Sequence, residues 1–180
     1  MRPPTSRSGG TIHVITALSS TTAHHTRHAA DAVRSALSAH FLRHDPYRSG
    51  ALLAELARDH CAQDALDELL QVCAETLRVV NRSPSRRLLV LDQEAVVNQL
   101  VLTGLIRPGQ RRLVAELLHR AAGLAAGMRG PGDPDALAGL SDHEVLVGAW
   151  AATLGLVWTA ARTLRQDQAT VYLRVLNADL

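Results

Sequence analysis

Seventeen consecutive residues without a charged side chain, Val145–Ala161, constrain the fold of this chain more than any other stretch. Ser141 and Glu144 precede them at the spacing of a capping box, in which the serine oxygen accepts one helix N–H and the glutamate reaches back to another. A helix that is apolar on every side must be buried on every side, in a protein core or in lipid. The sequence therefore predicts a central helix over Ser141–Leu164.

The predicted central helix has one face of large side chains and an opposite face of small ones. The large face consists of Leu146, Trp150, Leu154 and Val157, and the small face of Gly148, Ala152, Gly155 and Thr159. We expect Trp150 to be buried and the small face to let another backbone come close. The expected packing or interface residues are Gly148, Trp150, Ala152, Gly155 and Trp158.

A membrane span is not the preferred interpretation of this stretch. Seventeen helical residues extend about 25 Å, short of the roughly 30 Å hydrocarbon core. No apolar core of a secretory signal precedes Thr11. Cys61 and Cys73 are too far apart along one helix to form a disulfide. Two unpaired cysteines are typical of a protein from a reducing compartment. We expect a cytoplasmic protein without a membrane segment.

Apolar residues recur at helical spacing along most of the chain. The segments are 30–41, 52–56, 66–80 and 113–124, and Asp45–Pro46, Arg107–Gly109 and Gly127–Pro134 interrupt them. Helix caps are available around Ser20–Thr22, at Ser49 and at Asp64, although 52–80 also fits one long helix. With 180 residues and 47% hydrophobic content, the chain suits one domain. We expect a disordered tail over 1–10 and one domain over 11–180, an all-α compact bundle of five to seven helices.

Three short segments leave a small α/β protein open as the alternative fold. Thr11–Leu18, Leu88–Leu91 and Thr170–Leu176 are apolar or β-branched and could each form a strand. No glycine-rich turn follows the first two, where a phosphate-binding loop would sit. The bundle is preferred, with a single helix from Pro84 to Ile106. The alternative there is a strand over Leu88–Leu91 followed by a helix that Asp92 caps and that runs to Ile106.

Histidine is the one enriched reactive residue type, with nine in the chain. His24/His28 and His40/His44 are separated by four residues, which allows two imidazoles to share a metal ion. The two pairs point about 120° apart on one helix, so they do not combine readily. We expect exposed surface histidines and no cofactor, with a metal-binding bundle as an alternative.

Arginine supplies all 19 basic residues. Two groups of arginines stand out: Arg82, Arg86 and Arg87, and Arg107, Arg111 and Arg112. Cations at the start of a helix, as at Arg111 and Arg112, are unfavourable unless an anion approaches the helix N-terminus. A DNA- or phosphate-binding regulator is therefore a second alternative. The net charge of +2 and the 3% aromatic content favour it less.

The absence of lysine excludes Schiff-base chemistry and lysine-dependent phosphate loops. The sequence Asp59–His60–Cys61 contains the residue types of a nucleophile and its base, but consecutive side chains on a helix point about 100° apart. We therefore expect no catalytic residues. The favoured function is a non-catalytic helical protein–protein interaction or regulatory module that associates with itself or with a protein partner.

Overall fold

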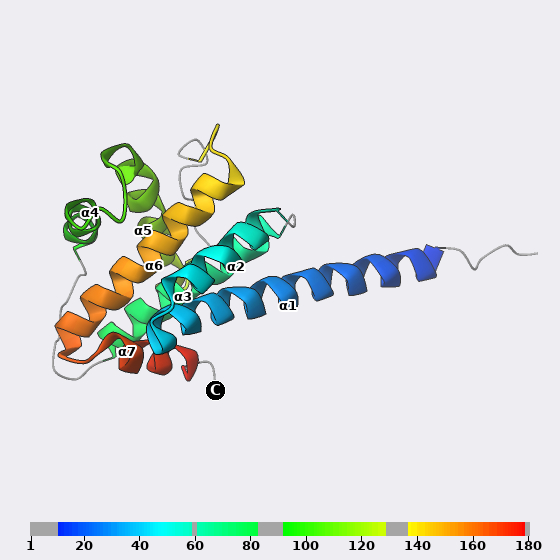
Figure 1. Cartoon of the computed structure of the whole chain (residues 1–180). Helices are drawn as coiled ribbons and strands as arrows, with labels where there is room; N and C mark the ends of the chain where they lie inside the picture. Colours follow the sequence, from blue (N-terminus) through cyan, green and yellow to red (C-terminus); the bar gives the residue numbers. More distant parts are fainter. Residues whose placement is uncertain (1–10, 59–60, 83–91, 129–136, 179–180) are drawn as a thin grey trace, which may run out of the picture.

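The computed structural model describes residues 11–58, 61–82, 92–128 and 137–178, and over 11–26 its backbone alone. Within these ranges the chain forms seven α-helices and no strand (Figure 1). They are α1 (Thr11–Arg43), α2 (Pro46–Arg58), α3 (Ala62–Asn81), α4 (Gln93–Leu102), α5 (Arg111–Ala125), α6 (Asp142–Leu164) and α7 (Gln168–Leu176), with a short 3₁₀ helix η1 (Pro108–Gln110) before α5. The all-α bundle is confirmed.

The α/β alternative is wrong for two of its three segments. Thr11–Leu18 lies in α1, and Thr170–Leu176 lies within α7. Leu88–Leu91 falls outside the described residues. The segment forms a helix because Asp167 caps its start: the Asp167 carboxylate accepts the Thr170 backbone N–H at 2.8 Å.

The helix α6 is the centre of the bundle, as the uncharged stretch predicts. Its capping box is formed: the Glu144 N–H donates to Ser141 Oγ at 3.3 Å, and the Ser141 N–H donates to Glu144 Oε2 at 2.9 Å. It packs against α2, α3, α4, α5 and α7. By length and composition α6 could cross a membrane, yet 67% of its most apolar window is buried within this chain. That burial is what a core helix requires.

The small face of α6 receives leucine side chains instead of a neighbouring backbone. A Cβ atom on Gly148 would lie 2.7 Å from Leu113 Cδ2 of α5, and one on Gly155 would lie 3.0 Å from Leu100 Cδ1 of α4. Two glycines therefore provide the space into which α4 and α5 pack. The expected burial of Trp150 is only partial, because its ring lies at the edge of the core.

Two helix starts differ from the predicted caps. Ser49 lies inside α2, where its hydroxyl donates to the Pro46 carbonyl at 2.8 Å. The cap is Asp45, and Pro46 takes the first helical position, where a missing N–H is tolerated. The segment 52–80 forms two helices, and the N-cap position of α3 is Cys61, with Asp64 in the first turn.

The single helix expected from Pro84 to Ile106 is wrong at Asp92. This residue has extended backbone angles, and its carboxylate accepts the N–H groups of Glu94 and Ala95, so α4 starts there. Gly104 has a φ of 73°, which ends the helix before Ile106. The caps at both ends outweigh the apolar periodicity.

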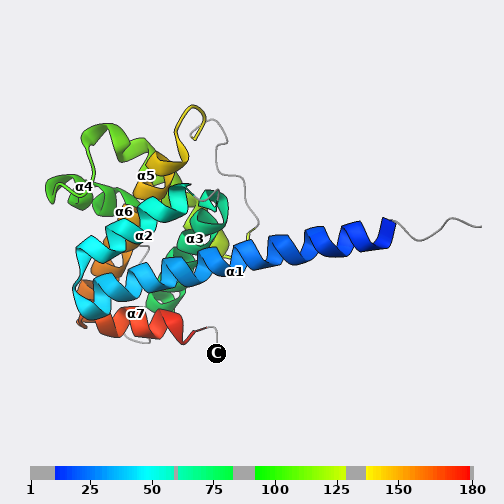
Figure 2. The ribbon, with the colours of Figure 1, turned by 45° about the vertical axis from the view of Figure 1, so that its right-hand side comes forward.

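The N-terminal half of α1 projects beyond the other helices (Figures 1 and 2). It begins at Thr11, earlier than the cap expected around Ser20–Thr22. The C-terminal half packs against α2, α3 and α7, and Ala29 is the first described residue that is buried. The described core of the domain therefore starts near Ala29.

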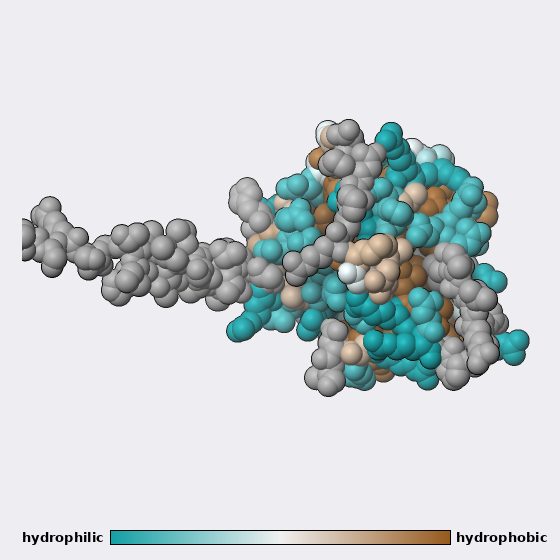
Figure 3. Space-filling model, turned by 180° about the vertical axis from the view of Figure 1, so that it is seen from behind, coloured by the Kyte–Doolittle hydropathy of each residue, from teal (hydrophilic) through white to brown (hydrophobic). Residues whose placement is uncertain are grey.

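Figure 3 shows the bundle from behind the view of Figure 1. Hydrophilic residues cover most of this face, with smaller hydrophobic areas between them.

Candidate functional site

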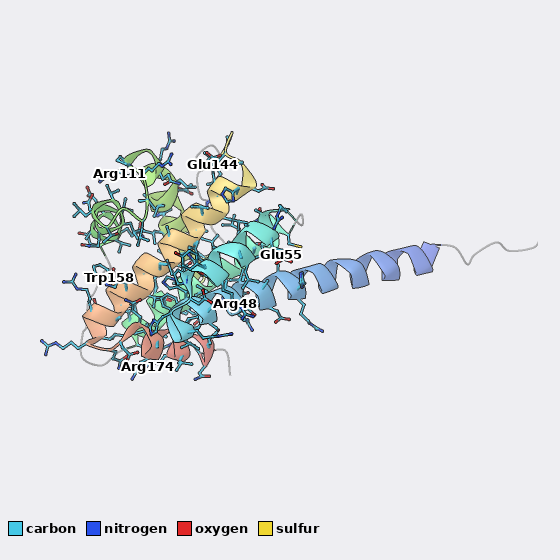
Figure 4. The ribbon with its side chains drawn as sticks, in the orientation of Figure 1. Arg48, Glu55, Arg111, Glu144, Trp158 and Arg174 are labelled. Atoms are coloured by element: carbon cyan, nitrogen blue, oxygen red, sulfur yellow. The ribbon has the colours of Figure 1, made fainter. Side chains whose placement is uncertain are left out.

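Trp158 lies near the C-terminal end of α6 (Figure 4). Three adjoining hollows surround it. Their volumes are about 550, 340 and 270 Å³, and Trp158 lines all three. His40 lines both the largest and the smallest hollow, and Gln99 lines both of the two smaller ones. We call this combined depression the Trp158 groove. It joins residues from α1, α4, α6 and the first turn of α7.

The smallest hollow is the apolar part of the groove. Leu100, Leu154 and Gly155 line it, together with Leu105, which is 51% exposed. Leu102, at the end of α4, is 81% exposed. Large exposed leucines beside an apolar hollow are typical of an interaction surface.

The largest hollow is the basic part of the groove. His40 and His44 line it from α1, and Arg162 and Arg165 from the end of α6. The guanidinium carbon of Arg162 lies 4.9 Å from the centre of the Trp158 ring, a cation–π contact. This hollow can therefore present positive charge next to an aromatic surface.

One carboxylate, Asp167, also lines the largest hollow. Its Oδ1 accepts the Thr170 backbone N–H at 2.8 Å, and its Oδ2 accepts the Thr170 hydroxyl at 2.6 Å. These bonds lower the pKa of Asp167, because they favour its charged form. Both carboxylate oxygens of Asp167 therefore serve to cap the start of α7.

His40 is half-buried between two aromatic rings. Its ring meets those of Phe41 and Trp150 edge-on, at centroid distances of 5.0 and 5.9 Å. Burial lowers the pKa of His40, and the nearby His44 lowers it further. The folded protein therefore holds His40 neutral at a pH where the unfolded chain binds a proton.

This shift predicts a loss of stability in acid. As the pH falls below the ordinary histidine value of 6.5, the unfolded chain gains a proton that folded His40 does not accept, so the free energy of unfolding decreases. We expect the decrease in Tm between pH 7.5 and 5.5 to be smaller in His40→Gln than in the wild type, by thermal melts followed by circular dichroism. His119→Gln, at an exposed histidine of α5, is the control and should behave as the wild type. Equal acid sensitivity of His40→Gln and wild type would contradict the assignment.

The structure brings together one of the two predicted histidine pairs. His40 and His44 line the same hollow, whereas His28 is exposed elsewhere on α1 and the side chain of His24 lies outside the description. Among the described residues, no group of three or more His, Cys, Asp and Glu side chains could hold a metal ion. Metal binding by these histidines stays a prediction.

The described members of the two predicted arginine groups lie at opposite ends of α5. Arg78 of α3 donates to the carbonyls of Leu124 and Ala125, at 2.6 and 3.3 Å, so the end of α3 with Arg82 lies near the C-terminus of α5. Arg111 begins α5, about 21 Å away along that helix. Arg107 and Arg112 accompany Arg111, and Arg86 and Arg87 fall outside the described residues.

Arg111 already has a partner within the chain. Its guanidinium donates to the side-chain carbonyl of Asn98, which links α5 to α4. An anion site at Arg111 would have to compete with this contact. The DNA- or phosphate-binding interpretation stays a prediction, without a combined arginine surface among the described residues.

The two cysteines are free and buried. Burial raises the pKa of Cys73 to about 12, and its Sγ lies 3.2 Å from Thr153 Oγ1. A thiol with this pKa stays protonated at neutral pH, so Cys73 is unreactive. Its contact with Thr153 joins α3 to α6.

Sequence reasoning missed the basic hollow. Arg162, Arg165 and Gln166 follow the uncharged stretch and resemble an ordinary polar helix end. The four-residue spacing of Trp158 and Arg162 is the available signal, since it places both side chains on one helix face. Their proximity to His40 and His44 depends on the tertiary fold.

Comparison with protein-family models, with curated proteins and with solved structures finds no match to this chain. The geometry of the groove is therefore the basis for the proposed function.

Proposed function

We propose that this protein is a non-catalytic helical interaction module that self-associates through its α4–α6 face. This face is defined by Leu102, Leu105, Trp158 and the apolar hollow beside them. The observation that carries the proposal is the exposure of two large leucines at the end of α4: Leu105, which lines that hollow and is 51% exposed, and Leu102, which is 81% exposed. A reducing cytoplasm suits the two free, buried cysteines.

The α4–α6 face has the elements of a self-complementary interface. Leu102 and Leu105 project from it, and the hollow of about 270 Å³ can receive an apolar side chain. In a two-fold dimer the same surface patch meets itself, so each copy supplies both leucines and a hollow.

The strength of such a dimer follows from the four leucines that it would bury. Each leucine contributes up to about 2 kcal/mol when it is fully buried. Since Leu102 is 81% and Leu105 51% exposed before association, the four together contribute at most about 5 kcal/mol, near the lower end of the 4–15 kcal/mol that association costs in lost freedom. We therefore expect a weak dimer whose population rises with protein concentration.

Sedimentation equilibrium of the wild type and of Leu102→Glu tests the proposal. A charge at the centre of the interface should make the protein monomeric while its circular dichroism spectrum stays helical. Leu173→Glu, at a 45% exposed leucine of α7, is the matched control and should still dimerise. A wild type that stays monomeric, or a dimer that survives Leu102→Glu, would refute the α4–α6 interface.

A further inference from the structure

The largest hollow of the Trp158 groove has the size and the lining of a small-molecule site. Its volume of about 550 Å³ falls within the range of roughly 300–1,000 Å³ that is typical of ligand pockets. Phe41, Trp158 and Ala161 provide apolar wall, and the polar groups converge from the ends of two helices. This hollow is separate from the exposed leucines of the proposed dimer interface.

Cationic groups outnumber anionic ones in this hollow. Arg162 and Arg165 supply two guanidinium groups beside the half-buried His40, and the one carboxylate, Asp167, has both oxygens bonded to Thr170. Arg162 is held over the face of Trp158. An anion in the hollow would meet guanidinium donors, which bind carboxylates in a two-pronged geometry.

Two of the basic residues occupy backbone conformations that usually belong to glycine. His44 and Arg165 each have a φ of 54°, and they are the two non-glycine residues with positive φ in the described part of the chain. Each follows a helix end, where glycine adopts this conformation without strain. The chain thus places a basic side chain at both positions despite the backbone strain.

A buried polar atom in the same hollow is left without a partner. Gln166 lines it, and its Oε1 is buried with no hydrogen-bond partner among the described residues. Buried acceptors are rarely left unpaired in proteins. Because this atom has almost no accessible surface, the Gln166 amide gains a partner from the hollow when its side chain turns toward it.

From these observations we propose that the hollow binds a small organic carboxylate with an apolar body. The carboxylate is bound by Arg165 and Arg162, and the apolar body lies against Trp158 and Phe41. A hydroxyl or amino group on the natural ligand donates to Gln166 Oε1. The proposal goes beyond self-association and requires no second copy of the chain.

Isothermal titration calorimetry of the full chain with benzoate tests the proposal, with benzamide and acetate as matched probes. Benzamide keeps the ring without the charge, and acetate keeps the charge without the ring. We expect saturable binding of benzoate. Benzamide should bind at least about tenfold more weakly because it loses a charged hydrogen bond, and acetate at least about tenfold more weakly because it loses the buried apolar area of the ring. Equal affinities, or no saturable binding of benzoate, would overturn the proposal.

The variant Arg165→Gly separates binding from folding. Glycine relieves the positive φ, so the Tm should not fall, while the affinity for benzoate should fall at least about tenfold. Arg174→Gln, at an exposed arginine of α7 outside the hollow, should bind benzoate as the wild type does. Leu102→Glu should also bind normally, which distinguishes this site from the dimer interface. Benzoate binding that is unchanged in Arg165→Gly would overturn the proposal.

Discussion

Tyr172→Ala is expected to lower the free energy of unfolding by about 3–5 kcal/mol, because it removes a fully buried aromatic ring. The ring of Tyr172 lies 5.2 Å from that of Phe41, and its hydroxyl donates to the Arg34 carbonyl at 3.1 Å. These contacts attach α7 to α1 across most of the chain length. Urea unfolding followed by circular dichroism measures the loss.

Tyr172→Phe is the matched control, since it keeps the ring and removes only the hydroxyl. The hydroxyl bonds the Arg34 carbonyl and lies 3.3 Å from Ser38 Oγ. We expect a loss of about 1 kcal/mol, the usual net contribution of one hydrogen bond. An alanine variant no less stable than the phenylalanine variant would show that α7 does not pack on α1 as described.

Gly148→Leu is expected to lower the free energy of unfolding by about 3 kcal/mol, or to prevent folding, because the small face of α6 has no room for its side chain. The first added carbon would already lie 2.7 Å from Leu113 Cδ2 and 3.4 Å from Leu117 Cδ1. The remaining three carbons of leucine would force α5 away from α6. The measurement is again urea unfolding.

Two smaller substitutions control for helix propensity. Gly148→Ala should stay within about 1 kcal/mol of the wild type, since the helical preference of alanine offsets a small shift of Leu113. Gly50→Ala, in α2 with no atom near the added carbon, should raise the free energy of unfolding by about 0.5–1 kcal/mol. Full stability of Gly148→Leu would contradict the packing of α5 on α6.

The parts of the fold that depend on local chemistry could be predicted from the sequence. The start of α6 follows from a capping box of four residues, Ser141 to Glu144, and its burial follows from the absence of charge over Val145–Ala161. Periodicity was less reliable where a cap competed with it. The segment Pro84–Ile106 suggests one continuous helix, yet the carboxylate of Asp92 caps a helix that begins at Gln93.

The candidate site could not be predicted, because it depends on contacts between distant segments. Sequence patterns emphasise the two glycines and the tryptophans of α6, but do not show that Leu100 and Leu113 fill the glycine face. Likewise, the pair His40 and His44 suggests a metal site when considered alone. The fold instead places this pair in one hollow with the two arginines at the end of α6, Arg162 and Arg165.

Hydrogen–deuterium exchange of the native protein tests most directly the claim that α6 is the buried centre of the bundle. Peptides covering Val145–Ala161 should exchange most slowly, because their amides open only when the whole bundle unfolds. Peptides from α4, which is short and has exposed residues at both ends, should exchange sooner. Exchange of the α6 amides as fast as those of α4 in aqueous solution would contradict the account.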